Sequence, residues 1–441
     1  MMRKKITLSL LMLFPITTNA FPPYVYIANN SLSEVDVINT ANNSVLTRIP
    51  LPMMSGVAAQ PTCIAIAPNG QTVSVADSYL NGKSRTLAVS VIDATQQIPV
   101  LLSTTPIQNF ETGTCIAYTT DSSSIYITDG IARIYYLTSI ATNPTMTGTI
   151  VSIPEPNCIA IANTLNGETG YVGTVDHGIY TIAIPANINA TPIANTGNAN
   201  TFINAITAAP DGRTVYAVGQ DQVYGVGYLF AINTTSNTVS TTINLGLTNP
   251  SGIVVSPDGS ELYITDNEYG DVIVIPTDNL SSSSSFMSAG AIALAVTPDS
   301  KDLYVIDTNA NVSPYFVPAG TSAGASIPLG GSAMTYSIVI SPLSLLPPSV
   351  TGCKTKNVFL LQTDYINNIT WTAPTSGSPA AYAIYRDSML TQLVAIVPAS
   401  EPLQYYDHDR NPSVTYTYYI VSVDASGNQS APATVTVTQH C

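Results

Sequence analysis

Charge is the scarcest property of this chain. Only 9% of its 441 residues are Asp, Glu, Lys or Arg, and the chain has three histidines and one tryptophan. The 13 Lys and Arg are outnumbered by 27 Asp and Glu. Phosphate backbones and anionic lipid repel a protein with this balance, so nucleic acids and membrane surfaces are not expected partners.

Long apolar runs and common catalytic motifs are also missing. No stretch beyond residue 20 has the length and apolar character of a membrane span. The chain has no phosphate-binding loop, dinucleotide-binding fingerprint or His-Glu-x-x-His motif. These absences favour a role other than catalysis.

The first twenty residues have the layout of a secretory signal peptide. Cations at positions 3–5 precede a short, mostly apolar stretch at 6–16, and Ala20 is the small residue that a signal peptidase needs. We therefore expect cleavage after Ala20 and a periplasmic, cell-surface or secreted protein. An uncleaved N-terminal anchor is the alternative, although Pro15 interrupts the apolar stretch. Of the 13 cations, 10 would remain after cleavage, against all 27 Asp and Glu.

A strand–turn–strand pattern recurs along most of the chain. It is clearest at 257–266 (PDGSELYITD), 298–307 (PDSKDLYVID) and 210–216 (PDGRTVY). Proline presets φ at the first corner of a turn, aspartate closes the turn, and glycine accepts positive φ. Each turn follows alternating small and branched residues. A third strand and a weaker fourth follow, as at 272–275.

The turn recurs seven times, at spacings of 41 to 52 residues. Its anchors are Pro68, Thr120, Asn163, Pro210, Pro257, Pro298 and Pro342. Units of this length with four short strands are typical of a β-propeller, here with seven blades over residues 21–345.

The last repeat is incomplete. A first strand at 335–341 ends at Pro342, and the pattern then stops. The missing second and third strands match Tyr24–Asn29 and Glu34–Asn39 at the start of the mature chain. We therefore predict that both chain ends build one blade, which removes the open sheet edge.

These units resemble the YVTN-type β-propeller repeat. The resemblance is strongest at 24–29 (YVYIAN) and 262–266 (LYITD), and it weakens at the turns near Thr120 and Asn163, where Pro-Asp-Gly is absent. It implies a seven-bladed propeller. Propeller lactonases carry similar repeats and work at the central channel, so a hydrolase or lyase is the alternative to a binding protein.

Residues 346–441 form a second domain with a different pattern. Leu346-Pro347-Pro348 predicts a stiff linker. Trp371 follows an alternating run, 382–386 predicts a strand, and the stretch 416–427 resembles the sixth strand of a fibronectin type III module, with Tyr416 making the tyrosine-corner hydrogen bond.

The five cysteines fall into two groups. Cys63, Cys115 and Cys158 each lie five residues before a turn anchor, where the other blades have Ala, Gly or Ser. These positions predict small residues crowded near the propeller axis, although a soft-metal site for copper or zinc is the sharper alternative. Cys353 and Cys441 flank the second domain and are the expected disulfide in an oxidising compartment, although the pairing does not follow from sequence alone.

A second set of residues lies at the ends of the second strands. It contains Asp77, Asp129, Asp266 and Asp307. Four carboxylates on the loop face offer oxygen ligands for a divalent ion such as calcium. Aspartate at a turn normally accepts hydrogen bonds from nearby backbone amides, and we expect that role here.

His177 is the only propeller histidine, and it follows Asp176 in a predicted loop. The pair is a weak candidate for a general base, because no serine nucleophile can be identified beside it. We therefore predict no cofactor, catalytic set or metal as the leading case. The leading functional interpretation is a non-enzymatic protein that presents its loop face to a protein or glycan partner, with oligomeric state open.

Overall fold

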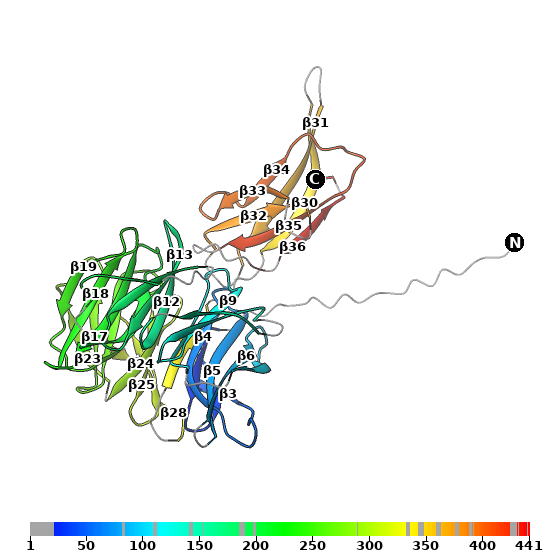
Figure 1. Ribbon diagram of the computed structural model, residues 1–441. Helices are drawn as coiled ribbons and strands as arrows, with labels where there is room; N and C mark the ends of the chain where they lie inside the picture. Colours follow the sequence, from blue (N-terminus) through cyan, green and yellow to red (C-terminus); the bar gives the residue numbers. More distant parts are fainter. Residues whose placement is uncertain are drawn as a thin grey trace. The chain divides into compact units, whose positions relative to one another are not determined.

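The computed structural model is all-β in the part of the chain it describes (Figure 1). It describes residues 22–81, 84–108, 113–140, 144–151, 153–184, 190–196, 200–288, 290–331, 336–342, 348–358, 363–374, 379–387, 390, 392–423, 430, 432–438 and 440–441. The predicted signal peptide and most of the predicted linker lie outside these residues. None of the described residues belongs to a helix that is long and apolar enough to cross a bilayer.

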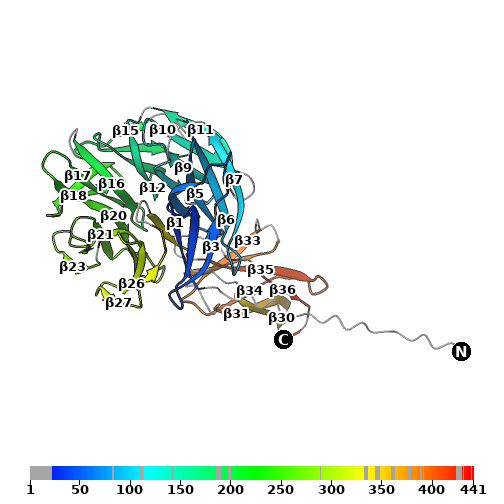
Figure 2. The same ribbon diagram turned by 90° about the horizontal axis from the view of Figure 1, so that it is seen from below.

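The chain divides into two compact units, one spanning Pro22–Ser344 and the other formed largely from residues after Leu345. Within the described residues, the first unit contains seven antiparallel sheets, which Figure 2 shows following one another around a centre. In hydrogen-bonding order the sheets are β29 (Tyr336–Ile340), β1 (Tyr24–Asn29), β2 (Glu34–Asn39) and β3 (Ser44–Pro50); β4 (Gln60–Ile66), β5 (Thr72–Asn81), β6 (Ser84–Asp93) and β7 (Val100–Gln108); β8 (Cys115–Tyr118), β9 (Ser124–Thr128), β10 (Arg133–Thr138) and β11 (Thr145–Val151); β12 (Pro156–Thr164), β13 (Gly167–Thr174), β14 (Ile179–Ala183) and β15 (Ala190–Pro192); β16 (Thr201–Ala208), β17 (Thr214–Asp221), β18 (Val226–Asn233) and β19 (Thr238–Asn244); β20 (Pro250–Val255), β21 (Glu261–Asp266), β22 (Asp271–Pro276) and β23 (Ser284–Met287); β24 (Ala291–Val296), β25 (Asp302–Asp307), β26 (Asn311–Phe316) and β27 (Thr321–Ser322), with β28 (Ile327–Pro328) also on β26.

Burial changes systematically across each of these sheets. The second strands are buried on both faces, so β1 and β9 contain no exposed side chain. The tyrosine of the repeated pattern is fully buried there, as in Tyr26, Tyr263 and Tyr304. The fourth strand β19 has mostly exposed side chains. Continuous apolar second strands and polar outer strands follow from sheets that pack face to face with two neighbours.

One sheet combines strands from the two ends of the first unit. β29 pairs with β1, with Ile338 opposite Ile27 and Ile340 opposite Val25. Ile27 packs in a core with Ile306 and Leu329, far along the chain. This burial fixes the register, because a one-residue slip would turn the apolar side chains out of the core.

The second unit has two sheets within the described residues. One contains β30 (Ser349–Val358), β31 (Thr363–Thr372) and β34 (Gln404–Asp407), and the other contains β33 (Leu393–Pro398), β32 (Ala381–Tyr385), β35 (Tyr416–Val423) and β36 (Ala433–Val437). Trp371 and Tyr382 pack together in the core, with ring centroids 5.5 Å apart. A disulfide joins Cys353 in β30 to Cys441 at the chain end.

Candidate functional site

The first strands of the seven sheets place the predicted small residues at equivalent positions. In five of these sheets, a β-bulge lies directly before the small residue: at the steps 61/63, 156/158, 203/205, 250/252 and 291/293. A bulge inserts one residue and turns its side chain away from the sheet pattern. The sequence analysis did not predict these bulges.

Polar side chains at several bulges connect neighbouring sheets. The amide of Asn157 donates to the carbonyl oxygen of Ile203 at 2.9 Å, and the hydroxyl of Ser251 donates to that of Ile292 at 3.2 Å. Asn204 makes the same kind of bond to Pro250. Because these bonds satisfy carbonyl groups in the next sheet, they fix the spacing of the inner strands.

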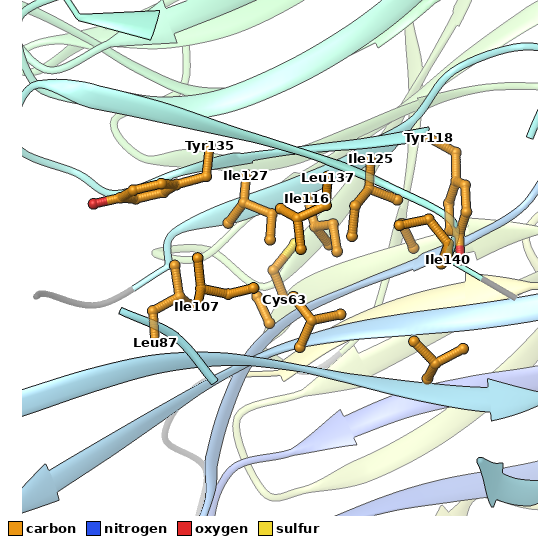
Figure 3. Close-up of a cluster of buried hydrophobic side chains, with 14 of the residues drawn as sticks. Cys63, Leu87, Ile107, Ile116, Tyr118, Ile125, Ile127, Tyr135, Leu137 and Ile140 are labelled. Atoms are coloured by element: carbon orange, nitrogen blue, oxygen red, sulfur yellow. The ribbon is translucent and has the colours of Figure 1, made fainter. Parts of the chain in front are cut away.

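The three cysteines follow one another on β4, β8 and β12. Cys63 and Cys158 are buried, and Cys115 is partly exposed. Figure 3 shows Cys63 among apolar side chains that include Leu87, Ile107 and Ile116. This setting agrees with small apolar packing, but the thiols also have polar partners. Among the described residues, no three His, Cys, Asp or Glu side chains gather in a group that could hold a metal ion.

The hydrogen bonds of the three thiols differ. The Cys115 thiol donates to the carbonyl oxygen of Ile159 at 3.9 Å, and the Cys158 thiol donates to that of Ile203 at 3.7 Å. Cys63 instead accepts a hydrogen bond from the hydroxyl of Ser337 at 3.7 Å. The Cys63 sulfur is thus placed as an acceptor, whereas the other two act as donors.

Three of the four candidate aspartates cap turns. Asp129 Oδ1 accepts hydrogen bonds of 2.9 to 3.0 Å from the amides of residues 131–133. Asp307 accepts from the amides of Asn309 and Asn311, and Asp266 accepts from that of Glu268. Their carboxylates are engaged by their own loops rather than gathered around a common point.

Asp77 has a different role. It is fully buried and accepts a hydrogen bond from the Ser90 hydroxyl, which is 2.7 Å from Thr104 Oγ1. Its Oδ1 has no hydrogen-bond partner among the described residues. Burial raises the pKa of Asp77 to about 7, and the Ser90 hydroxyl partly offsets this increase. The turn-capping role expected for this residue from the sequence does not apply.

The buried Asp77 carboxyl should make stability fall as pH rises. Between the ordinary pKa of 3.8 and about 7, the folded protein holds this proton while the unfolded chain has lost it, so its contribution declines across this window. Urea unfolding from pH 4 to 8 should show a shallower decline for Asp77→Asn. Ser90→Ala should extend the decline to higher pH. An unchanged slope in Asp77→Asn would contradict the assignment.

Asp176 and His177 lie in the turn between β13 and β14 but bond to different groups. His177 Nδ1 is 3.0 Å from the carbonyl oxygen of Val175, and Gln222 donates to Asp176 at 3.3 Å. Both Asp176 and Gly178 adopt positive φ, consistent with a tight turn. The exposed His177 ring is therefore oriented by its own turn rather than by the neighbouring carboxylate.

The residues Gly320–Gly324 (GTSAG) fit the Gly-x-Ser-x-Gly pattern of hydrolases. They lie between β26 and β28, and Ser322 belongs to the short strand β27. The Ser322 hydroxyl donates to the carbonyl oxygen of Gly324 at 2.8 Å. A nucleophile elbow requires a strand followed by a helix, so this segment does not supply that geometry.

The turns between second and third strands share one end of the sheets, which we call the turn face. Its described turns are residues 30–33, 129–132, 175–178, 222–225, 267–270 and 308–310. Several turns bond the segment that leads into the first strand of the same sheet, as from Val175 N to Glu155 O and from Asn267 N to Asn249 O. The Gln222–Asp176 bond joins two neighbouring turns.

Large apolar side chains are exposed at the tips of these turns. Tyr224 is 77% exposed and Tyr269 is 64% exposed. Leu32, Ile131 and Val223 are also exposed on other turns of the same face. Sequence reasoning missed this feature because a single apolar residue in a polar loop carries no periodic signal, and only the fold brings the tips together.

The same face is acidic over half of its turns. Between Arg133 and Lys301 the sequence contains a single Lys or Arg, Arg213. Arg213 precedes β17, at the end opposite to the turn 222–225. Exposed or partly exposed carboxylates on the turn face include those of Asp176 and Glu268. Aromatic rings beside uncompensated carboxylates favour cationic ligands.

Comparisons with known proteins support a β-propeller. Residues 112–288 match the family described as the SMP-30/Gluconolactonase/LRE-like region. No curated protein sequence matches the chain.

Three solved structures resemble this chain at low sequence identity. A functionally unknown protein from Desulfotomaculum acetoxidans has a TM-score of 0.57 at 16% identity, covering 72% of this chain and 99% of its own. Kuenenia stuttgartiensis hydrazine synthase has a TM-score of 0.51 at 17% identity, covering 64% and 90%. The β-propeller domain of Myceliophteria thermophila Cps50 (Swd1) has a TM-score of 0.52 at 9% identity, covering 66% and 92%. At these identities the likeness shows the fold alone, and the fold is that of a β-propeller protein.

Proposed function

We propose that this chain is an exported, non-enzymatic binding protein whose turn face holds a protein partner rich in Lys or Arg. The carrying observation is the set of exposed apolar tips, above all Tyr224 and Tyr269. Exposed tyrosines at the centre of an interface often dominate its binding energy. The acidic surroundings favour a cationic partner and speed its encounter.

The proposed framework is a seven-bladed YVTN-type propeller closed by both chain ends. Its support is that the first strands contact one another in sequence, that β24 contacts β29, and that β29 contacts β4. The pairing of β29 with β1 adds to this support. Such closure holds the turns rigidly, which lowers the entropic cost of binding.

We also propose that residues 346–441 form a fibronectin type III-like module that acts as a spacer or a second binding module. Sheets of three and four strands support it, and so does the bond from the Asn411 amide to the Tyr416 hydroxyl at 3.2 Å. Export by a signal peptide of residues 1–20 rests on the sequence, and the Cys353–Cys441 disulfide suits an oxidising compartment.

The turn-face proposal predicts that Tyr224→Ser with Tyr269→Ser will abolish binding to Lys- and Arg-rich amphipathic peptides. Each tyrosine should contribute about tenfold or more in affinity, and the wild-type affinity should fall with added salt. A peptide array and a glycan array, each probed with the mature protein, give the measurement.

The matched control is Leu165→Ser with Phe316→Ser. These side chains are 79% and 52% exposed at turns on the opposite end of their sheets. The control should retain peptide binding. Equal loss in the control, or binding to glycans alone, would contradict the proposal.

A lactonase-like hydrolase is the second candidate, because the family similarity covers 112–288. This function would require reactive groups at the central channel. Lactone hydrolysis by the purified protein, together with elemental analysis, tests it directly. Turnover that is lost in His177→Ala would favour this candidate over the binding protein.

A further inference from the structure

Cys63 lies where three first strands meet. Ser337 on β29 lies on one side, and its hydroxyl is 3.7 Å from the Cys63 sulfur. Ser337 Oγ itself accepts a hydrogen bond of 3.3 Å from the amide of Ile64. Cys115 on β8 lies on the other side and hydrogen bonds to Cys63 through its thiol. Two side-chain donors therefore converge on one sulfur atom.

These donors give the two thiols opposite acidities. Hydrogen bonding by Cys115 and by Ser337 lowers the pKa of Cys63, although burial opposes this effect. The same Cys63–Cys115 bond, together with burial, raises the pKa of Cys115 well above its usual value. Near neutral pH the pair therefore favours one shared negative charge, with the proton on Cys115.

Cys158 lacks this arrangement. Its thiol donates to the carbonyl oxygen of Ile203, and burial raises its pKa to about 12. It remains a neutral thiol in an apolar core that includes Ile179 and Ile203. Cys158 thus provides an internal comparison for the other two cysteines.

We propose that Cys63 and Cys115 together bind one soft monovalent cation of the Cu⁺ class. The cation lies between the two sulfur atoms and displaces the proton of Cys115 to solvent, so that two thiolates hold one ion. Soft thiolates select Cu⁺, and a cation of low coordination number needs no further ligand. A structural zinc ion requires four ligands, and the pair supplies only two.

The surroundings of the pair suit this ion. The partial exposure of Cys115 gives the ion a route to the otherwise buried pair. Apolar neighbours of Cys63, including Ile107 and Ile116, exclude water and competing hard ligands. Ser337 acts as a positioning residue, because its hydroxyl bonds to the Cys63 sulfur without being required as a ligand.

The test is anaerobic competition between the mature protein and bicinchoninate for Cu⁺. Ascorbate keeps the copper reduced and leaves the Cys353–Cys441 disulfide intact. We expect one Cu⁺ per chain. Loss of a sulfur ligand in Cys63→Ser or Cys115→Ser should weaken binding by more than the roughly 10- to 100-fold typical of outer-shell changes, and Ser337→Ala should fall in that range.

Cys158→Ser is the matched control and should bind Cu⁺ as the wild type does. A thermal unfolding scan with and without Cu⁺ gives a second readout. The wild type and Cys158→Ser should gain in melting temperature, and Cys115→Ser should not. Copper binding retained in Cys63→Ser and Cys115→Ser would identify an adventitious surface site and overturn the proposal. Equal loss in Cys158→Ser would replace the pair with a three-thiol site.

Discussion

Replacing Ile27 with alanine will lower the free energy of unfolding of the first unit by about 2–5 kcal/mol, the usual cost of truncating a buried isoleucine. Ile27 is fully buried and packs with Ile306 and Leu329, although almost 300 residues separate them in sequence. Its effect therefore measures how strongly the N-terminal strand supports the far end of the unit. Urea unfolding followed by far-UV circular dichroism gives the value.

Two further variants bracket this prediction. Deletion of residues 22–29 removes β1 and four fully buried side chains, which together exceed a typical stability of about 5–15 kcal/mol, so the first unit should not fold. Leu32→Ala, at an exposed position beyond β1, should change stability by no more than about 0.5 kcal/mol. A deletion variant that unfolds cooperatively at the wild-type urea concentration would show that β1 is dispensable.

The second large effect belongs to the second unit. Asp407 is 3% exposed and accepts hydrogen bonds from Arg386 Nη2 at 2.6 Å and Arg386 Nε at 3.2 Å. It also accepts from the buried Tyr418 hydroxyl. Asp407→Ala leaves the guanidinium without its partner, which should cost about 3–5 kcal/mol. Trp371, the only tryptophan, lies in this unit, so its fluorescence reports this loss separately.

The control for Asp407 is Asp364→Ala. Asp364 pairs with the exposed His408 at 2.6 Å, and exposed pairs of this kind contribute little to stability. The Trp371 unfolding transition should therefore stay near that of the wild type. Similar destabilisation by both variants would show that burial of Asp407 is not the source of its effect.

Much of the strand pattern was predictable, because local turns and apolar runs carry it. The predicted strands at Tyr24–Asn29 and Glu34–Asn39 coincide with β1 and β2. The turn at Pro257 precedes β21 as predicted, since proline, aspartate and glycine each restrict the local backbone. Such signals need only a few neighbouring residues to take effect.

The site depended on contacts that no local signal encodes. Asp77 and Asp129 occupy equivalent positions in the repeat, yet Ser90 and burial make one a buried carboxyl while free amides make the other a turn cap. The bulges before Cys63 and Cys158 depend on pairing with the next strand. The opposite acidities of Cys63 and Cys115 arise only once their strands are neighbours.

Hydrogen exchange of the mature protein, read by mass spectrometry, tests the pairing of the two chain ends most directly. Amides of residues 24–29 and 336–340 should exchange slowly and with one common opening free energy, because each strand protects the other. Ile27→Ala should speed both segments equally. Fast exchange at 336–340 beside slow exchange in β20 and β21 would contradict the account, because it would leave β29 without its partner strand.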